Sequence, residues 1–224
     1  MRVLSYILGV TVVAATFMNA SAAGAGGRHP KLAGFPSDMI WQNAPAEWHV
    51  EGDSLTLVAG RKTDWFSWPG GGYRADRSPR LLFKAAGDFM FSTKVDVESH
   101  VTYDAGCIAL YGTDSLWAKL CLERQGDDRL DVVSVVTHGE SDDATSFPAA
   151  GTSIYLKVAK ADGAIFFYAS EDGKAWTIIR KFNLESKDGL WAGFSAQSPD
   201  GDGASASFTD FRYLPEKVNI WKLS

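Results

Sequence analysis

Several features that large classes of protein require are scarce or missing in this sequence. Lys and Arg number 22 against 27 Asp and Glu, so the chain lacks the basic excess that attracts nucleic acid or an anionic membrane. No apolar pattern at helical spacing persists over three turns. The Gly-x-Ser-x-Gly, His-Glu-x-x-His and phosphate-loop motifs are absent as well. The slight excess of acidic residues disfavours nucleic acid as a partner and is compatible with a neutral or cationic ligand.

One apolar run, at 3–17, follows the positively charged start of the chain. A membrane anchor needs about 18 or more apolar residues, and this run is shorter and interrupted by threonines. Small residues of the kind that signal peptidase cleaves come next, at 19–23. We therefore predict a removed signal peptide at 1–23, no membrane span, and a secreted protein, extracellular or periplasmic. The Gly-, Ala- and Pro-rich stretch at 24–37 is predicted to be a flexible leader.

Short apolar and β-branched runs, separated by turn signals such as Ala161-Asp162-Gly163, fill the chain from 38 to 214. This punctuation is typical of one antiparallel β-sandwich or barrel, followed by a tail at 215–224. The last strand is expected to lie near the N-terminal one. The predicted strands are 48–50, 54–59, 89–97, 105–111, 116–123, 131–137, 153–160, 164–170, 176–182, 190–196 and 206–213.

The stretch 105–123 alternates cleanly on both sides of a turn, so its two faces can be separated. One face is entirely apolar and is predicted to be core: Ile108, Leu110, Leu116, Ala118, Leu120 and Leu122. The other face is mixed: Cys107, Ala109, Tyr111, Trp117, Lys119, Cys121 and Glu123. Aromatic and charged groups together favour a partly wet groove that stacks sugar rings and bonds their hydroxyls. A solvated outer sheet is the alternative.

A turn centred near Asp114 places Cys107 opposite Cys121. In an oxidising compartment neighbouring cysteines usually bond, and this short loop would contribute about 3 kcal/mol. Two buried free thiols are the alternative, because directly paired positions are not ideal for an unstrained bridge. Cys107, Cys121 and His138 do not form the spacing pattern of a metal site. The loop 200–203 lacks the further ligands of a calcium site. We predict neither a metal nor a cofactor.

An aromatic loop at 65–74 offers a second set of ligand contacts, through Trp65, Trp68 and Tyr73. Its three consecutive glycines would allow an aromatic platform to hinge over a groove. The alternative is a hydrophobic lid on the core.

Several runs in the chain resemble a concanavalin A-like domain family of unknown function, the one that includes the regulation-of-enolase protein. The resemblance covers 41–213 and implies a two-sheet antiparallel jelly-roll sandwich of the lectin and glucanase type. The runs that carry it are 63–66, 103–106, 117–123, 134–137, 141–142, 168–176 and 197–199.

The resemblance also implies a common cleft for a set of matching positions. The cysteines depart from the family pattern, and a bridge there would narrow or stiffen the cleft. The matching positions are Trp65, Tyr103, Asp104, Trp117, Lys119, Glu123, Thr137, Asp142 and Gln197.

These observations favour a secreted carbohydrate-binding protein with its ligand groove on the concave sheet. The first alternative is a glycoside hydrolase or lyase with Glu123 as acid or base, for which Asp104 and His138 are further catalytic candidates. A retaining glucanase of this fold would carry paired acids on a Glu-x-Asp-x-x-Glu strand, and that string is absent. The second alternative is a structural protein of the cell envelope.

Overall fold

The computed structural model describes residues 30–222. The predicted signal peptide at 1–23 and the first six residues of the predicted leader at 24–37 lie outside these residues. Within the described part of the chain, no helix is long and apolar enough to cross a membrane.

Nearly all regular structure in the described residues is β-strand, as the turn pattern predicted. A single short 3-10 helix, η1 (Ile220–Lys222), lies in the tail. The strands are β1 (Ile40–Gln42), β2 (Glu47–Glu51), β3 (Ser54–Gly60), β4 (Trp65–Ser67), β5 (Arg74–Asp76), β6 (Arg80–Lys84), β7 (Phe89–Glu98), β8 (Ala105–Thr113), β9 (Leu116–Arg124), β10 (Leu130–His138), β11 (Glu140–Pro148), β12 (Ser153–Ala161), β13 (Ala164–Ser170), β14 (Thr177–Asn183), β15 (Trp191–Gln197) and β16 (Gly203–Leu214).

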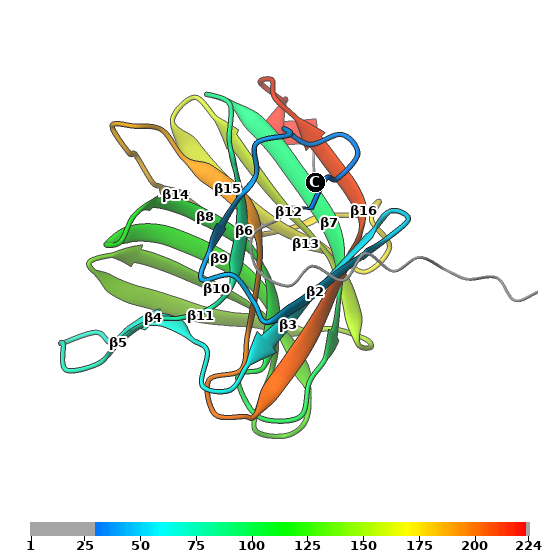
Figure 1. The fold of residues 1–224 in the computed structure, drawn as a ribbon. Helices are drawn as coiled ribbons and strands as arrows, with labels where there is room; N and C mark the ends of the chain where they lie inside the picture. The colour runs from blue at the N-terminus through cyan, green and yellow to red at the C-terminus, as the bar shows by residue number, and fades with distance from the viewer. Residues whose placement is uncertain (1–29, 223–224) are drawn as a thin grey trace, which may run out of the picture.

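Two seven-stranded antiparallel sheets pack face to face as a jelly-roll sandwich (Figure 1). The first has the order β1-β6-β15-β8-β9-β10-β11, and the second has the order β14-β13-β12-β7-β16-β3-β2. The C-terminal strand β16 pairs with β3 as well as β7, so it does lie beside an N-terminal strand. A separate two-stranded hairpin, β4–β5, projects from the sandwich near β11 (Figure 1).

The main core lies between the sheets and consists of the apolar side chains on the inward face of each strand. Leu120 and Leu122 of β9 are fully buried there, as the alternation in 105–123 predicted. The packing begins within the predicted leader, where the Phe35 ring meets Phe83 and Phe91 edge-to-face with centroids 5.2 and 5.5 Å apart. Phe35 therefore belongs to the packed domain.

The β8–β9 hairpin has the predicted register. Tyr111 pairs with Trp117, and Cys107 pairs with Cys121. The two cysteines form a disulfide, and both are buried. The bond joins adjacent strands on the side of the sheet that faces away from the main core.

The turn-and-alternation pattern predicts no strand at β1, β4, β5, β6 or β11, and three of these misses have a clear physical reason. β4 and β5 have three residues each and pair only with each other, so they carry too little pattern to detect. β11 is largely exposed and polar because it is an edge strand that pairs only with β10. Backbone hydrogen bonds hold such a strand without an apolar face.

The C-terminal tail docks on the outer side of the second sheet. Val218 and Ile220 pack against a small cluster that includes Met90 and Phe166. The Tyr168 hydroxyl donates to the backbone carbonyl of Ile220 at 3.3 Å.

We predict that Gly193→Ala severely destabilises the protein. A Cβ at Gly193 would lie 1.9 Å from the backbone oxygen of Leu81 on the neighbouring strand β6, and a backbone atom cannot yield as a flexible side chain does. The expected loss is about 3 kcal/mol or more in the free energy of unfolding, measured by urea denaturation. Gly151→Ala is the matched control, because a Cβ there meets nothing within 4 Å. Equal stability of the two variants would contradict the close backbone contact between Gly193 and Leu81.

Candidate functional site

The face of the first sheet that points away from the main core is partly covered by the β4–β5 hairpin. Trp65 of β4 stacks on Trp117 of β9, with ring centroids 4.1 Å apart. The Arg80 guanidinium lies over the other side of Trp65, 4.2 Å from its centroid. Both tryptophans are 2% exposed, so this part of the face is dry, contrary to the predicted wet groove.

Beside the covered part, a cavity of about 400 Å³ opens over β9, β10 and β15. Its floor comes from the sheet, and its walls come from the hairpin and from two loops near Tyr103 and Asp200. The lining residues are Asp64, Phe66, Trp68, Tyr73, Tyr103, Lys119, Glu123, Val133, Val135, Asp143, Gln197, Pro199 and Asp200.

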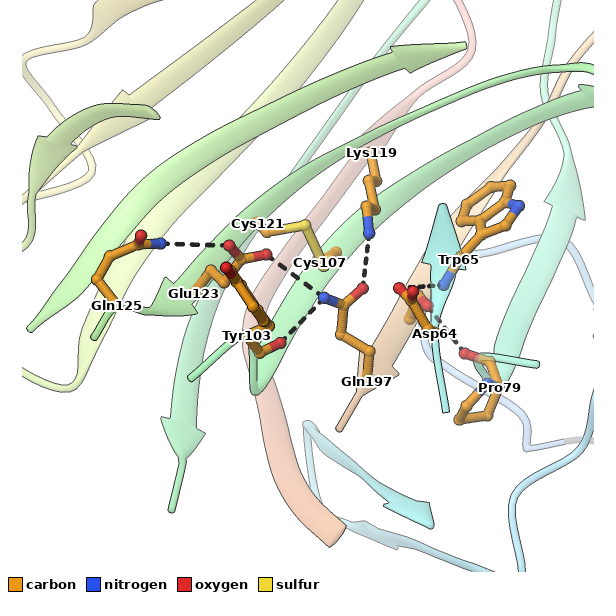
Figure 2. The surroundings of a disulfide bond; sticks show 11 residues. Asp64, Trp65, Pro79, Tyr103, Cys107, Lys119, Cys121, Glu123, Gln125 and Gln197 are labelled. Carbon is orange, nitrogen blue, oxygen red and sulfur yellow. Dashed lines mark hydrogen bonds between the residues drawn. A yellow bond between two sulfur atoms is a disulfide. The ribbon is translucent and has the colours of Figure 1, made fainter. Parts of the chain in front are cut away.

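A chain of polar side chains crosses the floor of the cavity. Lys119 Nζ donates to Gln197 Oε1 at 2.7 Å, and Gln197 Nε2 lies 3.4 Å from Glu123 Oε2. Gln125 Nε2 donates to the other carboxylate oxygen of Glu123 at 3.2 Å. Figure 2 shows the Gln197 amide between the ammonium and the carboxylate. The amide thus links two charged groups that lie four residues apart on one strand.

The disulfide is buried on the same face of the sheet as this floor. Cys121 stands between Lys119 and Glu123 on the cavity side of β9, and Cys107 is its partner on β8. Figure 2 shows the sulfur bridge beside the Gln197 amide. The cross-link fixes the two strands under the polar chain.

Burial changes the acid–base behaviour of both charged floor residues. Removal from water raises the pKa of Glu123 from 4.5 to about 7, an effect that the ammonium of Lys119 partly opposes. Burial also lowers the pKa of Lys119, against the pull of Asp64, Glu123 and Asp143. A carboxylic acid that titrates near neutral pH in a cavity can donate or accept a proton there.

The hairpin wall is held in place by Asp64. One carboxylate oxygen accepts the backbone N–H of Trp65 at 2.7 Å, and the other accepts the hydroxyl of Tyr73 at 2.9 Å. Burial and the adjacent Asp64 carboxylate raise the pKa of Tyr73. At the tip, Gly70, Gly71 and Gly72 all have positive φ, between 81 and 91°, which side chains rarely allow.

The opposite wall depends on Tyr103, which adopts a left-handed backbone with φ 73°. Its carbonyl accepts a hydrogen bond from Gln197 Nε2 at 3.0 Å, and its N–H donates to the Arg124 carbonyl at 2.8 Å. The ring is 47% exposed at the rim of the cavity. A non-glycine residue in this region of φ often marks a functional site.

The exposed aromatic rings of the described residues gather at this cavity. Among residues 30–222, the exposed large hydrophobic residues are Trp68, Tyr73, Val101 and Tyr103. Three of these four line the cavity, and Val101 is two residues from Tyr103.

The cavity therefore brings together six of the ligand-binding residues that the sequence suggested, from four separate parts of the chain. They are Trp68, Tyr73, Tyr103, Lys119, Glu123 and Gln197.

Other residues that the sequence suggested as ligand contacts lie outside the cavity lining and stabilise the fold. Trp65 and Trp117 pack on each other, as described above. Asp104 is fully buried, and its Oδ2 accepts the backbone N–H groups of His100 and Val101 at 2.8 and 2.9 Å, which fixes the loop before β8. Tyr111 donates its hydroxyl to Asp114 at 2.8 Å.

The suggested residues at the far end of β10 and on β11 also lie outside the cavity lining. The Thr137 hydroxyl is 2.8 Å from that of Ser141. Asp142 forms an ion pair with Arg180 at 2.6 Å, and His138 Nε2 lies 3.2 Å from the Asn183 carbonyl oxygen.

Sequence reasoning missed several lining residues, chiefly Asp64, Asp143 and Asp200. Asp143 pairs with Val135, whose other neighbour is Lys119, so it sits on the cavity side of β11. Alternation of inward and outward side chains along β11 could have predicted this position, but the polar sequence of β11 is not typical of a strand. Asp64 adjoins Trp65 within a run that carried the family resemblance.

Within the described residues, no group of three or more His, Cys, Asp or Glu side chains could hold a metal ion.

The two packed antiparallel sheets and the cavity on one outer face define a jelly-roll sandwich of the concanavalin A-like type. Residues 41–216 match the family described as protein of unknown function DUF1349. The chain belongs to this family. No curated protein sequence gives a significant match.

Solved structures of similar fold include proteins of several kinds. A functionally unknown protein from Saccharomyces cerevisiae has a TM-score of 0.74 at 24% identity, over 80% of this chain and 97% of that chain. A xylan beta-1,4-xylosidase from Bacillus halodurans has a TM-score of 0.58 at 16% identity, over 84% of this chain and 40% of that chain. A family 18 polysaccharide lyase has a TM-score of 0.52 at 13% identity, over 82% of this chain and 100% of that chain.

These likenesses establish the fold. The chain matches less than half the length of the xylosidase.

We predict that Glu123 makes the stability of the protein depend on pH. Because its folded pKa is about 7 against 4.5 for the ordinary group, its stabilising effect is complete below pH 4.5 and is lost as the pH rises through about 7. Glu123→Gln keeps this position neutral at every pH. Relative to wild type, the variant should gain about 3 kcal/mol in free energy of unfolding between about pH 4 and pH 8.

Urea denaturation at a series of pH values measures this difference. Removal of an exposed carboxylate on β7, by Glu98→Gln, is the matched control. Parallel pH profiles for wild type and Glu123→Gln would contradict the assigned burial of the carboxyl group.

Proposed function

We propose that this protein is secreted and binds a carbohydrate in the cavity on the outer face of the first sheet. The main support is the gathering of Trp68, Tyr73 and Tyr103 around a polar floor. Sugar rings have apolar faces that stack on aromatic rings, and hydroxyls that need hydrogen-bond partners. The cavity offers both kinds of contact within one space.

The polar floor suits hydroxyl groups because the side-chain oxygens of Gln197 and Glu123 line the cavity and have lone pairs left to accept hydrogen bonds. The Gln197 amide is held by Lys119 on one side and by the Tyr103 carbonyl and Glu123 on the other. Preformed groups of this kind lose little conformational freedom when a ligand binds. The fold resemblance to carbohydrate-active proteins is consistent with this proposal.

Secretion is supported by two observations. The sequence at 1–23 has the layout of a signal peptide. The Cys107–Cys121 disulfide is compatible with an extracellular location, because such bonds persist in oxidising compartments. Kinship with the regulation-of-enolase protein in particular stays a prediction.

We predict that Trp68→Ala and Tyr103→Ala each weaken glycan binding by about tenfold, because each removes a stacking surface. Both rings are exposed, so the free energy of unfolding should change little. A glycan array identifies a ligand, and isothermal titration calorimetry then compares the variants. Trp191→Ala is the matched control, since this partly exposed tryptophan on β15 lies outside the lining of the cavity. A blank array would favour the structural cell-envelope role instead.

A second candidate function follows from the raised pKa of Glu123. A carboxyl group that titrates at about 7 could serve as the general acid or base of a glycoside hydrolase or lyase. Asp64 and Asp143 line the same cavity and would supply a second carboxylate.

Incubation of the mature protein with a panel of polysaccharides, followed by a reducing-sugar assay, distinguishes a binder from an enzyme. The proposed binding function predicts no sugar release from a glycan that binds. Release that Glu123→Gln lowers by at least about 100-fold would establish the enzyme. Release that Glu123→Gln leaves unchanged would exclude Glu123 as its acid or base.

A further inference from the structure

The charges around the cavity are mainly negative. Asp64, Asp143 and Asp200 line it, together with Glu123, which ionises only as the pH rises through its raised pKa of about 7. Lys119 is the only cationic residue among the described lining. A ligand therefore meets an acidic environment, and this environment bears on which sugars the proposed function would admit.

Lys119 is poorly placed to neutralise a negative ligand. Its side chain is 2% exposed, and its ammonium already donates to Gln197 Oε1 at 2.7 Å. The carboxylates of Asp64, Glu123 and Asp143 also act on it electrostatically. A uronate or sulfated sugar would find this ammonium engaged and would face the exposed carboxylates of Asp143 and Asp200.

The aromatic rim reinforces this preference. Trp68, Tyr73 and Tyr103 are each about half exposed, at 58, 48 and 47%. The faces of aromatic rings carry negative potential and attract cations within about 6 Å of the ring centroid. Exposed rings beside carboxylates are the usual chemistry for recognition of an ammonium group, and neither feature favours an anion.

We propose that the cavity selects glycans that carry a protonated amine, that is, amino sugars without an N-acetyl group. This inference rests on the proposed carbohydrate-binding function and adds the charge class of the sugar. The sugar rings stack on the aromatic rim, and the ammonium lies toward the acidic side of the cavity, where Asp143 is exposed on β11.

Four probes test the charge class. Isothermal titration at about pH 5.5, below the range in which amines lose their proton, compares a glucosamine hexamer, an N-acetylglucosamine hexamer, an oligogalacturonate and choline. We expect the glucosamine hexamer to bind about tenfold more tightly than its acetylated counterpart, and the oligogalacturonate to bind least. The preference should shrink at about 0.5 M salt, because salt screens charges near the surface.

Two neighbouring aspartates provide a matched pair of variants. Asp143→Asn removes a cavity carboxylate and should abolish most of the preference for the free amine. Asp142→Asn changes the adjacent residue, which pairs with Arg180 away from the cavity, and should leave the preference intact. Asp200 is less informative, because its carboxylate also lies 3.9 Å from Lys62 Nζ.

The possible outcomes bear differently on the charge inference and on the proposed carbohydrate binding. Equal affinity for the two hexamers, or tighter binding of the oligogalacturonate, would overturn the charge inference and leave carbohydrate binding standing. Binding of choline without any oligosaccharide would overturn both and indicate a small cationic ligand. No binding by any of the four probes would overturn the charge inference, and a blank glycan array would then overturn the proposed function as well.

Discussion

Trp65 lies flat on Trp117, and this contact decides where the β4–β5 hairpin sits on the first sheet. Arg80 closes the stack from the other side, so the hairpin is anchored through three large side chains from different strands. The anchor leaves part of the sheet face uncovered. Asp64, at the base of the hairpin, and Trp68 and Tyr73, beyond β4, then become one wall of the cavity.

The floor of the cavity contains two buried ionisable groups, whose removal from water costs free energy. Burial of a lysine and a glutamate removes both from water, and a buried charge pair is often no more stable than an apolar substitute. Here the Gln197 amide satisfies both groups, and Gln125 supplies a further donor to Glu123. Titratable groups perturbed by burial in a cavity are typical of functional sites.

Backbone conformation also contributes to the shape of the site. The left-handed φ at Tyr103 turns its ring outward to the rim while its carbonyl points at Gln197. Buried Asp104 holds this loop from beneath through the N–H groups of His100 and Val101. A residue that resembled a ligand contact in sequence thus supports the neighbouring residue that lines the cavity.

The sequence by itself determined the all-β architecture, the two faces of β8–β9 and the pairing of Cys107 with Cys121, because these follow from local alternation and one turn. Alternation also placed Lys119 and Glu123 on the side away from the main core. It could not show that the hairpin dries one half of that face, nor that edge strand β11 brings Asp143 to the cavity. Those features depend on contacts between segments far apart in the chain. Only the tertiary structure decided them, because no local pattern encodes which distant segments meet.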